Sequence, residues 1–357
     1  MKLSILGSGI AALSAAQAAV LAGIDVQVYT KNRPGAATPA AAGMLTPSFE
    51  ASGAEQTLIS LAVESLRLYP KWIEGIVAET GCHIDYRSCG ALMMALHHDH
   101  LAELSQLEQF QQKLGLSTQR LSKSAVQDLE PAISPKQVGG LFAQSEQLIN
   151  PSDLHKALQT QLEHNQKACF IPYSQAFLSE RDNNRAELIV DGTNVTSDQI
   201  LIADGAWSKM FLSELPLRPV KGQYLLLKGE ELLSRTIRTP DVYIVPRNEG
   251  LYYIGATMEE EGFSLSRTAG GALDLLYHAW QIFRGVYELD LIHHGVGLRP
   301  ALRDNLPAIG SYKYSNLHLS IGYYRHGILL APIAAQLLVK QLLSPSDTPF
   351  SPERFSQ

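Results

Sequence analysis

The pattern of apolar and polar residues at the start of the chain predicts a strand, a helix and a second strand in direct succession. Residues 2–6 form a short apolar run, 10–21 a stretch rich in Ala and Leu, and 25–29 a second strand-like segment. Short apolar runs are typical of buried strands, and the longer stretch between them favours a helix. Two strands joined by a helix are the unit from which α/β folds are built.

The rest of the chain predicts helices first and strands later. Residues 55–80 have helical periodicity, 84–96 alternate as strands do, and 98–130 predict two polar helices. Asn150 predicts the start of a helix over 154–162. The remaining predicted elements are strands at 187–190, 199–203 and 317–321, a β-rich region over 219–258, and helices near 271–285 and 331–343.

This order predicts an α/β fold in which a β-rich domain is inserted into a Rossmann-like dinucleotide-binding domain. A ligand is expected in the crevice between the two domains. The segments assigned to the dinucleotide-binding domain are 1–80, 145–217 and 298–345; those assigned to the substrate-binding domain are 81–144 and 218–297; and 346–357, rich in Ser and Pro, is expected to be a tail.

The turn after the first strand has the glycine spacing of a dinucleotide-binding fingerprint. It reads Gly7-Ser8-Gly9-Ile10-Ala11-Ala12, which is G-x-G-x-x-A between a strand and a helix. Gly7 allows the tight turn, Gly9 lets the backbone approach a pyrophosphate, and Ala12 keeps the helix close to the strand. The N-terminus of the helix directs free N–H groups at the phosphates. A strand-to-helix turn that binds nothing is the alternative.

The residue that usually holds the ribose is missing from this fingerprint. An acidic residue normally closes the second strand, but here the chain continues as Thr30-Lys31-Asn32-Arg33. Thr30 offers a weaker acceptor in its place. Lys31 and Arg33 suit the 2′-phosphate of NADP, or they belong to a solvated loop. The fingerprint therefore indicates a dinucleotide without indicating which one.

Composition and charge argue against several classes of protein. The 357 residues carry a formal net charge of −6 that is spread without blocks, so nothing favours a nucleic-acid partner. No apolar run reaches the roughly 18 residues of a membrane span. Because the first strand begins at residue 2, no signal peptide is expected, and three cysteines without metal or disulfide spacing favour the cytoplasm. The histidines within 97–100 and 293–294 lack partners at metal-ligand spacing, so no metal site is expected.

Six segments resemble the D-amino-acid-oxidase family, in the order in which that family has them and over nearly the whole chain. They are Ala41-Ala42-Gly43-Met44, 202–208, 220–223, 243–247, Gly297-Leu298-Arg299-Pro300 and 322–332. The last two are the most specific. Within the family, the chain is most similar to the glycine oxidases of thiamine biosynthesis. The dinucleotide of this family is FAD, held without a covalent bond, so the resemblance implies non-covalent FAD here.

The resemblance also implies where the substrate binds. It places Arg299 on the carboxylate of an amino acid, where a guanidinium forms two parallel hydrogen bonds, and it places the hydroxyl of Tyr243 on the same carboxylate. Met44, Met258 and Arg325 would line the substrate pocket. Asp241 stands near the pocket mouth, where relatives can carry His, and would change which amines enter.

The contacts to the cofactor follow from the same resemblance. The implied FAD-binding residues are Gly7, Gly9, Ala12, Thr30, Ala42, Gly43, Met44, Gly205, Trp207, Gly322, Arg325, His326, Gly327 and Ile328. Asp204 stands where the family usually has Thr or Ser before the glycine at 205, and this change is expected to have no effect. Taken alone, Tyr243 and Met44 are more typical of core residues and Trp207 of packing, whereas Arg325 is equally typical of a structural ion pair.

The activity that the resemblance implies is oxidative deamination of glycine and of small amines such as sarcosine. A hydride passes from the substrate to flavin N5, dioxygen is reduced to hydrogen peroxide, and the imine gives glyoxylate and ammonia. No side-chain base is needed, which suits a sequence without an obvious catalytic histidine. The partners considered are a second copy of the chain and a thiazole synthase that receives the imine.

Four other functions stay open at this point. The chain could be an oxidase of D-amino acids or sarcosine, or a dehydrogenase that reduces a quinone in place of oxygen. It could also act on a carboxymethylaminomethyl group in tRNA, or be a flavoprotein that has lost catalysis. The absence of a basic patch argues against the tRNA function.

Overall fold

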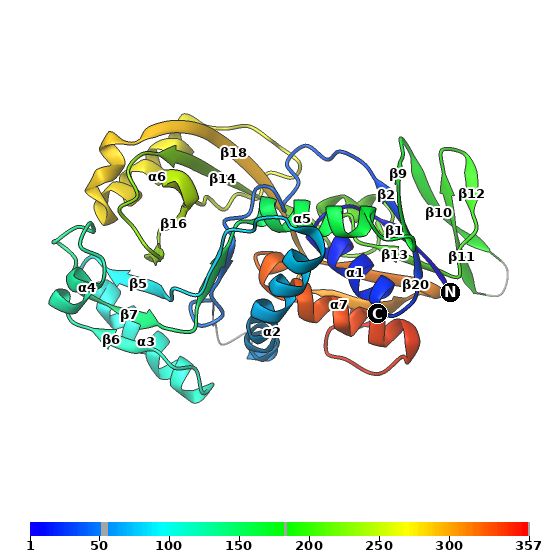
Figure 1. Cartoon of the computed structure of the whole chain (residues 1–357), viewed down its shortest axis with the longest axis horizontal. Helices are drawn as coiled ribbons and strands as arrows, with labels where there is room; N and C mark the ends of the chain where they lie inside the picture. The colour runs from blue at the N-terminus through cyan, green and yellow to red at the C-terminus, as the bar shows by residue number, and fades with distance from the viewer. Residues whose placement is uncertain (51–55, 182–183, 356–357) are drawn as a thin grey trace.

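The chain folds into two halves, each built on a large β-sheet (Figure 1). A computed structural model describes residues 1–50, 56–181 and 184–355. The half on the right of Figure 1 contains a mostly parallel sheet with helices packed on it, and the half on the left is dominated by antiparallel strands.

The first sheet has six strands in the order β19-β20-β13-β1-β2-β9. They are β1 (Lys2–Leu6), β2 (Asp25–Thr30), β9 (Ala168–Pro172), β13 (Gln199–Ile202), β19 (Ala308–Tyr312) and β20 (Tyr314–Ile321). All pairs are parallel except the pair of β19 with β20. Strands covered on both faces need continuous apolar runs, which is why β1 and β13 are recognisable in the sequence. The Rossmann-like α/β fold predicted from the sequence is confirmed.

Four helices pack together on one face of this sheet, as Figure 1 shows. They are α1 (Ile10–Leu21), α2 (Gln56–Thr80), α5 (Pro151–Glu163) and α7 (Gly327–Leu343). A small sheet covers the other face and consists of β10 (Ala176–Arg181), β11 (Arg185–Val190) and β12 (Thr193–Val195). Buried side chains such as Ile5 and Leu330 fill the helical side, and Leu6 and Leu188 fill the other.

The second sheet has eight strands in the order β18-β14-β17-β16-β15-β5-β7-β6. They are β5 (Ala91–Ala95), β6 (Gln119–Leu121), β7 (Gly139–Ala143), β14 (Arg218–Lys228), β15 (Thr236–Arg238), β16 (Tyr243–Arg247), β17 (Leu251–Gly255) and β18 (Asp290–Ala301). Its helices are α3 (His98–Lys113), α4 (Lys123–Leu129) and α6 (Ala269–Ile282). The long strands β14 and β18 pair along their whole length and lead back to the first sheet (Figure 1).

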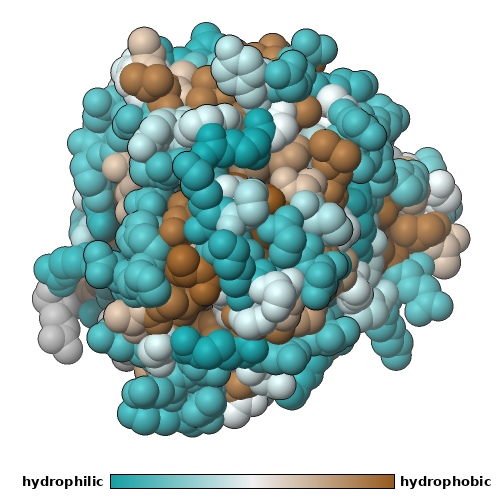
Figure 2. Space-filling view, turned by 90° about the vertical axis from the view of Figure 1, so that its left-hand side faces the viewer, coloured by the Kyte–Doolittle hydropathy of each residue, from teal (hydrophilic) through white to brown (hydrophobic). Residues whose placement is uncertain are grey.

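The outer face of this second half is mostly hydrophilic, with separate hydrophobic patches (Figure 2). Leu273 and Tyr277 on α6 are 67% and 52% exposed. A few exposed apolar side chains are ordinary on a folded protein.

Shorter elements connect the two halves. A three-stranded sheet joins β3 (Met44–Leu45), β8 (Gln147–Ile149) and β4 (Tyr86–Arg87). Short 3₁₀ helices lie at Gly205–Met210, Asn248–Gly250, Arg284–Glu288 and Pro352–Phe355. The sequence analysis missed several strands, including β9 and β18. Both are partly exposed and β18 contains Gly and Pro, which disguise a strand pattern.

The segment expected to be a tail is packed where it is described. Phe350 is 4% exposed, and its carbonyl accepts a hydrogen bond of 2.8 Å from the N–H of Ile309 in β19. Arg354 forms an ion pair with Asp304 at 2.8 Å. One buried aromatic side chain and one ion pair therefore fasten this closing segment to the first sheet.

The domain bounds given above stay a proposal, which the two-sheet organisation supports.

Within the described ranges, no helix is both long and apolar enough to cross a membrane.

Candidate active site

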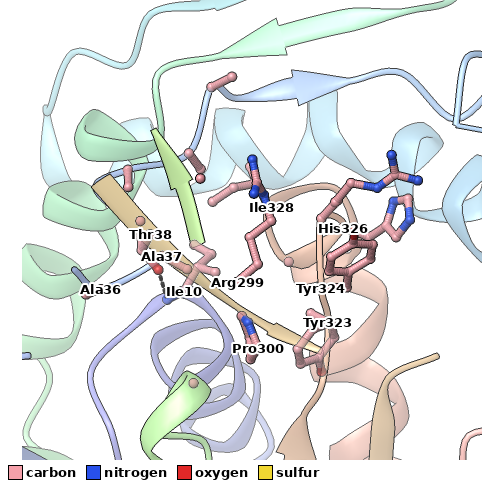
Figure 3. Close-up of a pocket in the computed structure, with 18 of the residues that line it drawn as sticks. Ile10, Ala36, Ala37, Thr38, Arg299, Pro300, Tyr323, Tyr324, His326 and Ile328 are labelled. Atoms are coloured by element: carbon pink, nitrogen blue, oxygen red, sulfur yellow. Dashed lines mark hydrogen bonds between the residues drawn. The ribbon is translucent and has the colours of Figure 1, made fainter. Parts of the chain in front are cut away.

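A cavity of about 490 Å³ opens at the carboxyl end of β1, between the two sheets (Figure 3). This end of the strands is where α/β sheets bind ligands. The predicted site residues that line it are Gly9, Thr30, Ala42, Gly43, Met44, Gly205, Trp207, Asp241, Tyr243, Met258, Arg299, Arg325, His326, Gly327 and Ile328. The structure thus brings together predicted residues from both sheets and from both ends of the chain.

Three predicted cofactor residues, Gly7, Ala12 and Gly322, are not among the described residues that line this cavity. Gly7 has a φ of +117°, and a Cβ there would lie 2.4 Å from the carbonyl oxygen of Ala203. Ala12 is fully buried, and a Cβ at Gly322 would lie 2.3 Å from the side chain of Leu302. These residues allow close approach of neighbouring segments, which is the role that the fingerprint gives to Ala12, and the positive φ of Gly7 fits the tight turn that the fingerprint gives to it.

The N-terminus of α1 provides donors for an anion. Gly9 precedes the helix and offers no side chain to cap it. The N–H of Ile10 donates to Oγ1 of Thr38 at 2.9 Å, shown as the dashed line in Figure 3. The next N–H groups of the first turn have no partner within the helix, and Ala11 lines the cavity. With the positive end of the helix dipole, these groups fit a pyrophosphate.

The loop of small residues after β2 lies against the second sheet. The hydroxyl of Tyr253 donates to the carbonyl of Ala40 at 2.6 Å. Nη2 of Arg247 donates to the carbonyls of Ala41 and Ala42 at 3.0 and 3.2 Å. The small side chains therefore allow the loop backbone to lie on β16 and β17 while it lines the cavity.

Arg299 extends from β18 across the neighbouring strand β14. Its Nη1 donates to the carbonyl of Lys221 at 3.3 Å and to the carbonyl of Thr257 at 3.1 Å. A Cβ at Gly222 would lie 2.3–2.6 Å from the guanidinium atoms of Arg299. Because Gly222 has no side chain, it leaves the space through which Arg299 reaches the cavity. Figure 3 shows Arg299 between Thr38 and His326.

Tyr243 begins β16 and lies opposite Gly255 of β17. Burial raises the pKa of its hydroxyl, and the nearby positive charge of Arg299 only partly opposes this. At neutral pH, Tyr243 is therefore a neutral phenol beside Arg299 and can donate a hydrogen bond. The two residues predicted to bind a carboxylate lie in the same part of the cavity.

A group of paired charges forms another part of the cavity wall. Glu50 forms ion pairs with Arg238 and, at 3.2 Å, with Arg325. Burial by itself would raise the pKa of Glu50, but the two arginines more than offset it and lower the pKa to about 2. Burial lowers the pKa of His326 to about 4, so its imidazole is neutral at pH 7.

The rim of the cavity holds two of the predicted pocket residues. The Asp241 carboxylate is 44% exposed and lies 4.0 Å from Nε2 of His100 and 3.9 Å from Nδ1 of His278. Met258 is 66% exposed, and its sulfur accepts a hydrogen bond of 2.8 Å from Tyr324. Both side chains therefore lie where the cavity meets solvent.

Thr38, Glu50 and Arg238 were not predicted as site residues from the sequence, and Gly222 was noted only as part of the family segment 220–223. No local pattern marks the first three residues, because their partners are distant in the chain. Thr38 and Ile10 are 28 positions apart, and Glu50 and Arg238 are 188 positions apart. Only an expectation that small and charged residues near the family motifs face the site could have suggested them.

The cysteines at 82, 89 and 169 are free thiols. Throughout the described ranges, no group of three or more His, Cys, Asp or Glu side chains is arranged to hold a metal ion.

A parallel sheet whose glycine turn leads into a helix with free N–H groups, next to a cavity lined by arginines, fits a dinucleotide-binding protein. The family comparison agrees, since the model of the DAO family, described as FAD dependent oxidoreductase, matches residues 2–341. The chain belongs to this family, and FAD is its cofactor.

Relatives with known names fall within the same family. The chain is 30% identical over 351 residues to the "Bifunctional protein ThiO/ThiG" of Trichormus variabilis, which covers 97% of this chain and 53% of the relative. It is 28% identical over 340 residues to the glycine oxidase of Geobacillus kaustophilus, with 93% of this chain and 89% of the relative covered. The chain therefore spans about half the length of the bifunctional relative.

Solved structures show the same architecture. The crystal structure of glycine oxidase from Geobacillus kaustophilus superposes with a TM-score of 0.91 at 26% identity, covering 98% of this chain and 97% of the other. Iminodiacetate oxidase from Chelativorans sp. BNC1 superposes with a TM-score of 0.87 at 25% identity, covering 99% and 98%.

Proposed function

We propose that this protein oxidises glycine and small secondary amines such as sarcosine, with FAD as a non-covalent cofactor and dioxygen as the electron acceptor. From glycine, the products are an imine, hydrolysed to glyoxylate and ammonia, and hydrogen peroxide; from sarcosine, the same hydrolysis releases methylamine in place of ammonia. The observation that carries the proposal is the placement of Arg299 beside Tyr243 in the cavity that begins at the glycine turn. A guanidinium and a neutral phenol can together donate hydrogen bonds to the oxygens of one carboxylate.

The roles of the two residues follow from their contacts. Because Nη1 of Arg299 is held by two backbone carbonyls, the guanidinium has a fixed orientation before the substrate arrives. It binds the substrate carboxylate, and the Tyr243 hydroxyl donates a further hydrogen bond to it. Fixing the carboxylate fixes the Cα of a small amino acid, so that orientation supplies much of the reduction in the barrier.

Two ionisable groups in the described cavity wall, Glu50 and His326, are poorly suited to act as a base. Glu50 is ionised but is held between Arg238 and Arg325, and His326 is buried and weakly basic. We therefore expect the substrate amine to reach the site unprotonated. FAD, when bound, accepts the hydride from the substrate Cα and passes the electrons to oxygen. The protein contributes binding, orientation and exclusion of water.

The buried charges disfavour a substrate with two carboxylates. Arg238 and Arg325 line the cavity, but Glu50 pairs with both. By contrast, Arg299 forms no ion pair with a described residue, so we expect it to bind a substrate carboxylate. Asp241 at the rim should repel a second carboxylate. Iminodiacetate should accordingly be a poorer substrate than glycine or sarcosine.

The visible spectrum of the purified protein tests this proposal. A yellow protein that loses its colour on anaerobic addition of glycine or sarcosine, and produces hydrogen peroxide in air, is the expected result. Acid precipitation should release the flavin. Below substrate saturation, the rate of reduction should rise with pH towards the amine pKa. An oxidised spectrum after glycine, sarcosine, iminodiacetate and D-alanine would overturn the amine-oxidase function.

Two results would distinguish the related functions. Reduction by the amine without peroxide, and turnover only with an artificial dye, would identify a dehydrogenase. Faster reduction by D-alanine than by glycine would identify a D-amino acid oxidase.

One proposed partner rests on the relatives. Fusion of ThiO with ThiG in the Trichormus variabilis protein supports hand-off of the imine to a thiazole synthase for thiamine biosynthesis. A second copy of this chain, forming a homo-oligomer, is the other proposed partner. The free cysteines support the cytoplasm as the compartment. Sedimentation of the purified protein would test the oligomer.

A further inference from the structure

The acid that should follow β2 is absent, but the structure places another carboxylate at the same end of the sheet. Asp204 follows β13, which lies on the opposite side of β1 from β2. A Cβ at Gly7 would lie 2.9 Å from the Cα of Asp204, so Asp204 borders the glycine turn directly. Asp204 and Thr30 both line the cavity.

Arg33 connects the loop after β2 to this carboxylate. Its Nε and Nη2 donate to Oδ2 of Asp204 at 3.1 and 2.5 Å. Nη2 also donates to the hydroxyl of Tyr173 at 3.2 Å, and the guanidinium lies 5.7 Å from the ring centre of Trp207. The Arg33 side chain is only 11% exposed, so these contacts hold it in place.

Asp204 has acceptor capacity left after it binds Arg33. Both hydrogen bonds from Arg33 go to Oδ2, and no described residue donates to Oδ1. An ionised carboxylate has about four acceptor positions. The residue is 7% exposed and lines the cavity, so an unused oxygen there has to be satisfied by water or by a bound hydroxyl.

The two cations of the loop are already engaged. Asp204 neutralises Arg33, and Nζ of Lys31 donates to the carbonyl of Ser174 and lies 5.7 Å from the ring centre of Tyr173. This arrangement suits hydroxyl groups and does not suit the 2′-phosphate of NADP.

We propose that Asp204, positioned by Arg33, binds the ribose hydroxyls of the adenosine half of FAD and so replaces the acid that is missing after β2. The carboxylate reaches the glycine turn from β13 instead of from β2. This inference rests on FAD as the cofactor and not on the amine substrate. A protein that binds FAD but does not oxidise amines would therefore not contradict the inference about Asp204.

The test is the affinity of the apoprotein for FAD, measured by quenching of flavin fluorescence. Asp204→Asn keeps the shape and removes the charge, and it should weaken FAD binding by about 10- to 100-fold. Binding of FMN, which lacks the adenosine, should be unchanged. Asp198→Asn is the matched control, because Asp198 precedes the same strand at its far end and accepts a hydrogen bond from the N–H of Lys2.

Two further measurements keep the inference testable if the variant folds poorly. In the unmodified apoprotein, 2′-deoxy-ADP should compete with FAD less well than ADP does. Thr30→Glu should restore FAD affinity in the Asp204→Asn protein and change it much less in the original protein. Unchanged FAD affinity in Asp204→Asn, or equal competition by ADP and 2′-deoxy-ADP, would overturn the proposal.

Discussion

Substitution of Gly222 by alanine tests the substrate site without altering any residue that binds the substrate. A Cβ at this position would lie 2.3 Å from Nη1, 2.5 Å from Nη2 and 2.6 Å from Cζ of Arg299. Ordinary contact requires at least 3.4 Å. Since Gly222 lies in the extended strand β14, alanine causes no backbone strain there. The guanidinium is the end of a flexible side chain, so it should be the group that moves, by about 1 Å.

The expected cost follows from that displacement. A misplacement of about 1 Å of a group that orients the substrate costs on the order of 100-fold in rate, or about 2.7 kcal/mol. The loss should appear in kcat/KM for glycine and in the affinity for a non-reacting carboxylate such as acetate. FAD affinity should be unchanged, because Gly222 belongs to the second sheet and not to the glycine turn.

The assay is anaerobic reduction of the flavin by glycine in stopped flow, with thermal unfolding measured in parallel. Gly270→Ala in α6 is the control, because a Cβ there would meet no atom within 4 Å. Arg299→Ala should cost about 2–5 kcal/mol in the same assay, and Arg299→Lys should recover only part. Normal kcat/KM in Gly222→Ala, together with a strong loss in Arg299→Ala, would show that the guanidinium does not work from the observed position. Normal kinetics in Arg299→Ala would remove the residue from the site.

Three further predictions concern buried polar groups. Tyr243→Phe should weaken substrate binding by about 0.5–3 kcal/mol, measured by flavin reduction, with FAD still bound; an unchanged KM would show that the hydroxyl has another role. Glu50→Gln should lower the free energy of unfolding at pH 7 by about 3–5 kcal/mol, because it breaks a buried ion pair. Since the pKa of Glu50 is lowered to about 2 in the folded state, the stabilisation that Glu50 provides should be lost as the pH falls below about 4.5. Urea unfolding at several pH values would check both expectations. Burial raises the pKa of Glu146 to about 8, so stability should fall as pH rises from about 4.5 to 8, and Glu146→Gln should abolish that fall; an unaltered slope in the variant would contradict this reasoning.

The sequence by itself determined the α/β class, the dinucleotide-binding turn and the residues that the family motifs carry. These features are local: a strand buried on both faces needs an apolar run, and the tight turn before the helix needs Gly7 with its positive φ. The motifs also indicated Arg299 and Tyr243, which the structure places together in the cavity.

The tertiary structure alone decided which distant residues meet. Asp204 pairs with Arg33 across 171 positions, and Glu50 pairs with Arg238 across 188 positions. Asp204 looked inconsequential in the sequence, because nothing near it indicates that the adjacent strands bring it to the glycine turn. The closing segment, which has the composition of a tail, is fastened by Phe350 and Arg354 for the same reason. Burial and pairing between strands depend on packing of the whole chain, and periodicity within a segment carries no information about them.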